Sequence, residues 1–244
     1  MTLIKLESIN STNQYMKNNI NHFNHLDVVY TDYQTNGLGR FQHQWYSSID
    51  SLTFSICLKQ GYQLNNFLPS FIAYIIHQSL SSFDIALEIK WPNDILIKGK
   101  KVAGVLIETL YQQTPIGIIV GIGINVNQSS FPSSIDQIAT SVYLNKGQRI
   151  DKTLLFDKII SLIQLEYPIF LRDQQPYINY INQYLAYKNQ AIEYTSNQQS
   201  YQAKCIKVND DGSLLIEMNQ THQSLQSNEV IHLRCLPKPS SMLQ

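Results

Sequence analysis

The sequence lacks several features that would assign it to a specialised class of protein. Its three cysteines, Cys57, Cys205 and Cys235, are odd in number and far apart, which argues against a disulfide framework and against a CxxC metal site. The 18 basic and 18 acidic residues balance, and neither sign forms a long run. The charge pattern of a dedicated nucleic-acid-binding protein is therefore missing, and an anionic ligand must be met by local charge.

The sequence also shows neither a leader peptide nor a membrane span. Residues 1–17 soon turn polar and contain no apolar core of a signal peptide. The most apolar stretch, IGIIVGIGINV at residues 116–126, is too short and too rich in glycine to cross a bilayer. We therefore expect a cytoplasmic protein with no membrane partner.

What is present is enough apolar sequence for a substantial core, since 43% of the 244 residues are hydrophobic. Apolar residues at helical spacing predict a helix over residues 66–83 and a second helix after Asp151, a plausible N-cap. Residues rich in β-branched and aromatic side chains predict strands at 28–35, 51–59, 85–91, 94–111 with a turn at Gly99, and 116–127. This mixture indicates an α+β fold with a mixed β-sheet flanked by helices.

The pattern of apolar and turn-forming residues changes after residue 187. Strand-like segments at 191–196, 201–210, 213–219 and 229–235 follow one another with hairpin signals and no helical period. We predict two domains, residues 1–187 and residues 188–244, the second being a small β-barrel.

One loop has the composition of a ligand-binding segment. Residues 34–45 read QTNGLGRFQHQW. Glycines permit positive φ and close approach of the backbone, an arginine offers a fork of donors for a carboxylate or phosphate, and a tryptophan offers a flat face. This loop would suit an anionic ligand that carries a ring.

Two further segments stand out. IKWPNDILIKGKKVAG at residues 89–104 places a polar turn between apolar strands, and it is either a tight turn whose Asn93 and Asp94 bond their own backbone or part of a site. GIGIN at residues 121–125 does not complete a dinucleotide fingerprint, so we predict a buried strand whose glycines leave room for a ligand or a neighbouring element. Ser11 and Gln14 have the spacing of a capping box at a helix start.

Five motifs together resemble the biotin protein ligases, the BirA-like enzymes. They are STN at 11–13, QTNGLGR at 34–40, KWPND at 90–94, KVAGVLIE at 101–108 and GIGINVN at 121–127. The resemblance extends along essentially the whole chain, and EVIHLRC at 229–235 is similar to the family's closing segment. It implies the biotin–lipoate ligase catalytic fold, which is class II synthetase-like, followed by an SH3-like barrel.

The resemblance also implies an activity. A biotin protein ligase activates biotin with ATP and Mg²⁺ to biotinyl-5′-AMP and transfers biotin to a lysine of a biotin carboxyl carrier protein, a partner that belongs to a biotin-dependent carboxylase. The match begins at Ser11, so we expect neither the N-terminal DNA-binding domain of many family members nor direct DNA binding. The sequence does not decide between a monomer and a homodimer.

The family pattern carries over to residues of several expected roles. Polar contacts to the ureido group of biotin are expected from Ser11, Thr12 and Gln34, with support from Asn13. The loop that covers biotin and the adenylate contains Gly37, Leu38, Gly39 and Arg40. The carboxylate and phosphate are expected to meet Arg40 and Lys101, with Gly104 closing the K-x-A-G motif. The nucleotide is assigned to Trp45, Asn93 and Asn125, while Asp94 either bonds the ureido group or helps to deprotonate the incoming lysine.

The loop departs from the family pattern GRGRxGRxW. Here Leu38 replaces one arginine, Gln42 a glycine and His43 another arginine. Two alternatives therefore accompany the ligase interpretation: a lipoate or octanoate ligase of the same fold, and a noncatalytic biotin-binding sensor.

Overall fold

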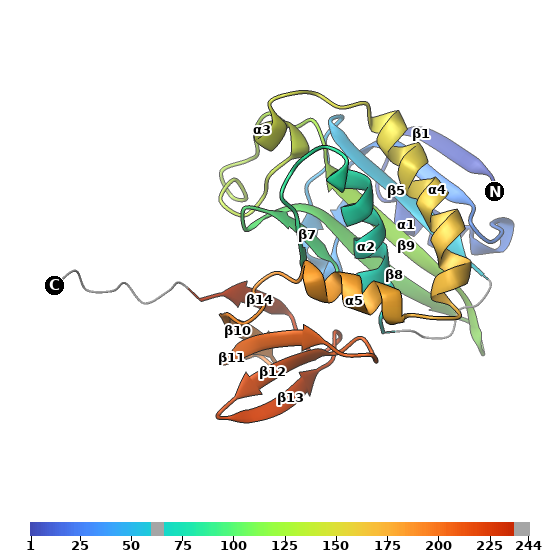
Figure 1. Cartoon of the computed structure of the whole chain (residues 1–244). Helices are drawn as coiled ribbons and strands as arrows, with labels where there is room; N and C mark the ends of the chain where they lie inside the picture. The colour runs from blue at the N-terminus through green and yellow to red at the C-terminus, as the bar shows by residue number, and fades with distance from the viewer. Residues whose placement is uncertain (60–65, 237–244) are drawn as a thin grey trace.

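The main element of the fold is a seven-stranded mixed sheet (Figure 1). The structure, a computed structural model, describes residues 1–59 and 66–236. The strands lie in the order β1-β2-β5-β9-β8-β7-β6. Their bounds are β1 Leu3–Ile9, β2 Val28–Gln34, β5 Ser51–Leu58, β6 Glu88–Lys90, β7 Asp94–Ile97, β8 Lys100–Tyr111 and β9 Pro115–Asn125. The pair β1–β2 is parallel and the other pairs are antiparallel, so the predicted mixed sheet is confirmed.

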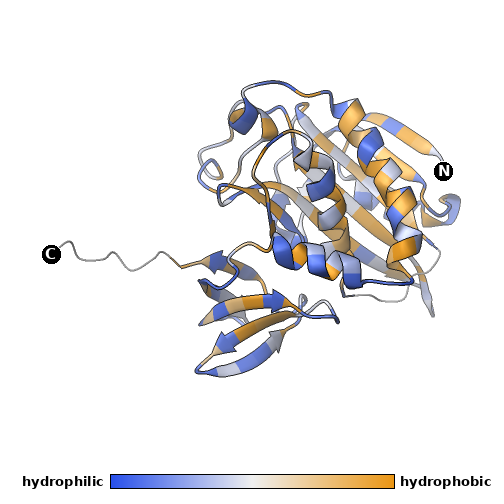
Figure 2. Cartoon of the chain, in the orientation of Figure 1, coloured by the Kyte–Doolittle hydropathy of each residue, from blue (hydrophilic) through white to orange (hydrophobic). Residues whose placement is uncertain are grey.

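Helices cover the two faces of this sheet unequally. The long helices on one face are α2 Leu68–Ser81, α4 Lys152–Phe170 and α5 Gln175–Gln183 (Figure 1). The short elements are α1 Thr12–Asn18, η1 Ile20–His22 and α3 Val142–Lys146. Apolar residues fill the central strands behind α2 and α4 (Figure 2), and a smaller apolar cluster around Met16 lies under α1. Among the helices described, none is long and apolar enough to cross a membrane.

Strand β5 shows why the second face can hold a site. Phe54 and Ile56 belong to the core under α2 and α4, whereas Cys57 belongs to the cluster under α1. Because side chains alternate along a strand, Thr53 and Ser55 share the side of Cys57. The strand is buried throughout, so these hydroxyls form a polar stripe under the start of α1.

The second sheet has five antiparallel strands in the order β13-β12-β11-β10-β14. Their bounds are β10 Ala191–Ser196, β11 Gln199–Val208, β12 Leu214–Met218, β13 Thr221–Leu225 and β14 His232–Cys235. This C-terminal sheet agrees with the expected SH3-like fold, although β13 was not predicted from its polar sequence. The division of the chain after residue 187 stays a prediction.

The C-terminal sheet lies beside the KWPND turn. The indole Nε1 of Trp91 donates to the carbonyl of Gly212 at 2.9 Å. Asn182 at the end of α5 donates through Nδ2 to the carbonyl of Val208 at 2.9 Å and accepts from the amide of Val208 at 2.7 Å. These contacts hold the C-terminal sheet against the region that carries the site motifs.

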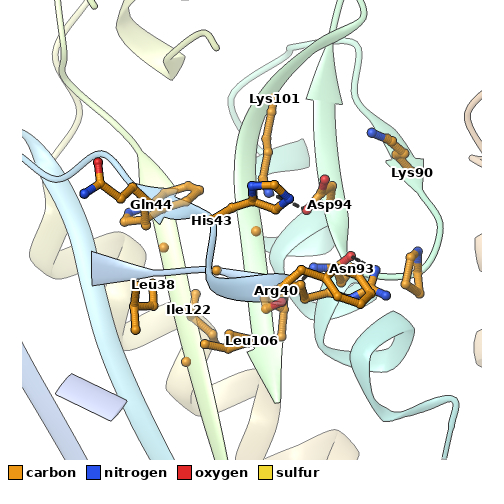
Figure 3. Close-up of a pocket in the computed structure, with 18 of the residues that line it drawn as sticks. Leu38, Arg40, His43, Gln44, Lys90, Asn93, Asp94, Lys101, Leu106 and Ile122 are labelled. Atoms are coloured by element: carbon orange, nitrogen blue, oxygen red, sulfur yellow. Dashed lines mark hydrogen bonds and ion pairs between the residues drawn. The ribbon is translucent and has the colours of Figure 1, made fainter. Parts of the chain in front are cut away.

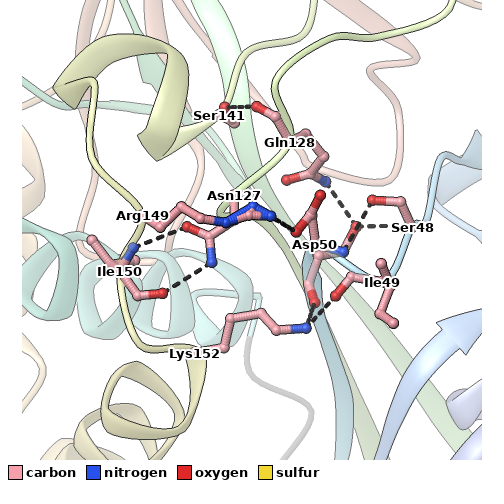
Figure 4. A network of polar contacts seen from close by, with 10 residues as sticks. Ser48, Ile49, Asp50, Asn127, Gln128, Ser141, Arg149, Ile150 and Lys152 are labelled. Carbon is pink, nitrogen blue, oxygen red and sulfur yellow. Dashed lines mark hydrogen bonds and ion pairs between the residues drawn. The ribbon is translucent and has the colours of Figure 1, made fainter.

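Polar contacts join the start of β5 and the segment that follows β9 to the neighbouring chain (Figure 4). Asn127 exchanges two hydrogen bonds with the backbone of Ile150, each 2.9 Å long. Arg149 forms an ion pair with Asp50 at 2.5 Å, and Lys152 donates to the carbonyl of Ser51 at 3.0 Å. The start of α4 is thereby joined to the loop that precedes β5.

Candidate functional site

The predicted site residues meet in one cavity of about 440 Å³ beneath the loop between β2 and β5 (Figure 3). The predicted residues that line it are Ser11, Thr12, Asn13, Gln34, Leu38, Gly39, Arg40, Trp45, Asn93, Asp94, Lys101 and Gly104. Gly37 and Asn125 do not line this cavity. The motifs, although distant in the sequence, therefore converge on one place in the fold.

One end of the cavity is built from neutral polar groups at the start of α1. Ser11 is the N-cap and accepts from the amide of Gln14 at 3.4 Å, which confirms the predicted cap, but Gln14 bonds Asn18 instead of completing a capping box. The amide of Thr12 donates to Oε1 of Gln34 at 2.8 Å. This end has the donors and acceptors for a neutral polar head group.

The glycines of β9 make room for two neighbouring side chains. A Cβ on Gly121 would lie 2.3 Å from Oδ1 of Asn13, and a Cβ on Gly123 would lie 2.5 Å from the ring of Trp45. The predicted role of these glycines is therefore confirmed, and the space they leave is taken by side chains that line the cavity. The indole Nε1 of Trp45 is buried without a hydrogen-bond partner among the described residues.

The loop over the cavity begins and ends in a small hairpin. Strand β3 Gly37–Leu38 pairs with β4 Gln44–Trp45, and the turn η2 Arg40–Gln42 lies between them. A Cβ on Gly37 would lie 2.9 Å from Nε2 of Gln34, so this glycine serves close packing. Neither Gly37 nor Gly39 has a positive φ; the left-handed residues are Phe41 at 54° and Gln42 at 62°. The expectation that the loop glycines adopt positive φ is therefore wrong.

Arg40 is half-buried and held by neutral oxygens. Its Nη1 donates to Oδ1 of Asn93 at 3.3 Å (Figure 3), and its Nη2 donates to the carbonyls of Ser227 and, at 3.1 Å, of Val230. Burial lowers the pKa of Arg40 and nearby Asp94 opposes that shift, yet a guanidinium remains charged. We expected Arg40 to face an anionic ligand; in this structure it joins the loop to the C-terminal sheet.

Lys101 and Asp94 form an ion pair at 2.7 Å beside the loop (Figure 3). A Cβ on Gly104 would lie 2.7 Å from Cε of Lys101, so the glycine of the K-x-A-G motif leaves space for the lysine. Asn93 donates to the carbonyl of Val105 at 2.7 Å. Asn93 and Asp94 thus contact neighbouring elements, and the alternative in which both bond their own turn is wrong.

Sequence reasoning missed Lys90, although it begins the KWPND motif. Lys90 lines the cavity, and burial lowers its pKa, an effect that Asp94 opposes and that Lys101 and Arg40 reinforce. Of the described lining residues, three are cationic side chains, Arg40, Lys90 and Lys101, and one is a carboxylate, Asp94. The cavity therefore has an excess of positive charge and favours an anion.

Residues of the C-terminal sheet also line the cavity and were not predicted. They are Val230, Ile231, His232 and Leu233. The ring of His232 lies 5.3 Å from the ring of His43 in the loop. The side chain of His232 is exposed, but partial burial and then repulsion from its neighbours His43, Lys90 and Arg234 lower its pKa. The resemblance of EVIHLRC to the family's closing segment was the signal that pointed here.

Asn125 lies in an adjoining cavity of about 660 Å³ that shares Trp45, Asp94 and Lys101 with the first. Its Oδ1 accepts from Nε2 of Gln128 at 3.1 Å. Its predicted contact with a nucleotide therefore concerns this second space. In the part of the chain that the structure describes, no three His, Cys, Asp or Glu side chains gather as a metal site.

Comparison with known proteins shows which family this fold resembles. Residues 6–125 match the biotin/lipoate A/B protein ligase family. The proteins to which the chain is similar beyond this segment are biotin protein ligases.

Three known proteins are similar over most of the chain. The bifunctional ligase/repressor BirA of Bacillus subtilis strain 168 is 30% identical over 216 residues, which cover 83% of this chain and 65% of that protein. The biotin protein ligase of Aquifex aeolicus, solved in complex with biotin and ATP, is 27% identical, with a TM-score of 0.86 over 96% of this chain and 99% of that one. The biotin protein ligase of Leishmania major in complex with biotinyl-5-AMP shares the fold, with a TM-score of 0.63 and 19% identity over 92% of this chain and 98% of that one.

Proposed function

We propose that this chain is a biotin protein ligase, which converts biotin and ATP to biotinyl-5′-AMP and pyrophosphate. It then transfers biotin to a lysine of a biotin carboxyl carrier protein and releases AMP. The observation that carries the proposal is the arrangement of neutral polar and charged side chains in the cavity. Ser11, Thr12 and Gln34 supply neutral polar groups to the cavity, and Arg40 and Lys101 supply cations. Asn13 packs over Gly121 of β9, whereas Lys101 packs over Gly104, which pairs with Gly123 two residues further along β9, so the two sets are separated along the strand. Biotin has the same order of groups, a neutral ureido head and an anionic carboxylate.

The first step brings two anions together, the biotin carboxylate and the α-phosphate. Positive side chains that are already in place can stabilise the charge that develops between them. The ion pair with Asp94 holds Lys101, and its side chain fits the space that Gly104 leaves. Its ammonium therefore needs little reorganisation. Arg40, in the loop, would stabilise the same developing charge. The loop would also exclude water from the mixed anhydride.

The contacts of Asp94 favour a role in the second step over a contact with the ureido group. Its carboxylate contacts Lys101, and the polar groups around Thr12 are bonded to one another. We therefore assign Asp94 to the approach of the acceptor lysine, whose ammonium must lose a proton before it attacks.

In this proposal ATP occupies the adjoining cavity, with its adenine ring near Trp45 and Asn125. A magnesium ion usually takes most of its ligands from water and from substrate phosphates, with one or two carboxylates from the protein. Of the described residues that line the adjoining cavity, the carboxylates are Asp94 and Glu193, which would suit a metal that enters with the nucleotide and offsets phosphate charge.

The test is transfer of biotin to a purified carrier domain with ATP and Mg²⁺, followed by mass spectrometry of the carrier. We expect one biotin per carrier and no lipoyl or octanoyl product when those acids replace biotin. Acylation by lipoate or octanoate would favour the related ligase activity. Tight biotin binding without pyrophosphate release would favour the noncatalytic sensor.

A further inference from the structure

A buried serine under α1 lies in direct contact with the polar end of the cavity. Ser55 is fully buried in β5. Its hydroxyl oxygen lies 2.7 Å from Oγ1 of Thr12 and 2.5 Å from Oδ1 of Asn13. Thr12 and Asn13 line the cavity, whereas Ser55 does not.

The contacts form a row of oxygens with too few protons. From one end they are Oδ1 of Asn13, the hydroxyls of Ser55 and Thr12, and Oε1 of Gln34, and the last contact measures 3.1 Å. Amide oxygens only accept, and each hydroxyl carries one proton. Three contacts therefore share two protons, and one contact has none.

The distances decide which contact lacks a proton. Nδ2 of Asn13 donates to Glu108 at 2.8 Å, which turns Oδ1 toward Ser55. Two oxygens at 2.5 Å require a proton between them, so Ser55 donates to Asn13. The geometry would allow Ser55 to donate to Thr12 as well, but its one proton is engaged by Asn13, so Thr12 supplies the proton of the 2.7 Å contact. The Thr12 hydroxyl also lies within donor distance of Oε1 of Gln34 at 3.1 Å, but that oxygen already accepts from the Thr12 amide at 2.8 Å, so this longest contact is the one left without a proton.

We propose that Ser55 is a positioning residue, which directs the hydroxyl proton of Thr12 away from the cavity so that Thr12 offers a ligand lone pairs alone. Such an acceptor takes an N–H group and disfavours a carbonyl or a disulfide. A ureido ring supplies N–H donors, whereas a dithiolane ring supplies none. Ser55 thereby favours biotin over lipoate, a selectivity that rests on the proposed function.

The experiment compares Ser55→Ala with wild type by calorimetric titration of biotin and by steady-state kinetics. Loss of one neutral hydrogen bond predicts that the Kd and KM for biotin rise about two- to tenfold. The KM for ATP and the kcat at saturating biotin stay unchanged, since no group in the adenylation site moves. Ser79→Ala removes another fully buried serine hydroxyl, one that bonds the carbonyl of Ile75 in α2, and should leave biotin affinity unchanged.

A double-mutant cycle shows whether Ser55 acts through Thr12. Thr12→Val removes the acceptor, so Ser55→Ala in that background should weaken biotin binding no further than the worse single variant. If Ser55→Ala does not fold, Ser55→Cys, with its weaker donor, takes its place in the same cycle. Biotin affinity equal to wild type in the serine variant, or effects that multiply in the double variant, would overturn the proposal. Wild-type protein that fails to bind biotin would instead reject the proposed function.

Discussion

Gly104 leaves the space into which the Lys101 side chain folds. Both residues belong to a motif that is visible in the sequence, but the sequence does not show why they occur together. A β-carbon at residue 104 would also come within 3.3 Å of Asp94, so the glycine accommodates the whole ion pair. The individual motif residues were therefore predictable from the sequence. Their packing against one another depends on the β-bulge between β7 and β8, which no local sequence pattern indicates.

Lys101→Ala tests the electrostatic role at this scale. If the ammonium stabilises the charge that develops at the phosphate, the rate of adenylate formation should fall by about two orders of magnitude or more. Single-turnover measurements of adenylate formation report this step. Lys100→Ala is the matched control, because Lys100 lies in the same strand and bonds the carbonyl of Asp136. Near-wild-type rates in a folded Lys101→Ala variant would contradict the assignment.

Strand β9 shows what can be predicted at the scale of elements. Its apolar run and the start at Pro115 were readable from the sequence, as were β2, β5, α2 and the N-cap of α4 at Asp151. Strands β1 and β13 and the short helix α3 were not. Strands β1 and β13 are half exposed or polar, and their pairing with β2 and β12 depends on long-range contacts that a local pattern does not contain.

Gly123→Ala tests the close contact between β9 and the loop. The added methyl group would meet the Trp45 ring at 2.5 Å and must displace it. If Trp45 packs near the adenine, the KM for ATP should rise about tenfold, the scale expected from a misplaced binding group. Gly117→Ala adds the same methyl group to the same strand with its nearest contact at 3.4 Å, and it should have little effect. Equal KM values for the two variants would remove Trp45 from the nucleotide site.

Across the whole molecule, the cavity is closed by two parts of the chain that the sequence assigned to separate domains. Arg40 reaches the carbonyls of Ser227 and Val230, and His43 contacts His232. Sequence reasoning gave the C-terminal segment no site residue, because its short strands carry no local signal of where they pack. The contact also places His43, which replaces a family arginine, against a second histidine.

The pH dependence of this contact follows from His232. Its pKa is lowered by burial and then by His43, Lys90 and Arg234, so the folded protein favours the neutral ring. The stability of the contact is present above the unfolded histidine pKa of about 6.5 and is lost as the pH falls below it. Acid should therefore loosen the loop from the C-terminal sheet.

His232→Asn tests this dependence, given a ligase that makes biotinyl-5′-adenylate. The dissociation rate of the adenylate, measured by a chase with excess unlabelled biotin, should rise for wild type between pH 7.5 and 5.5, because a protonated His232 would lie among positive side chains. The asparagine variant cannot gain that charge, so its rate should change less over the same range. His222→Asn in β13, which is exposed like His232 but does not line the cavity, is the control and should follow wild type. An equal acid response in the His232 and His222 variants would show that loop release depends on another group.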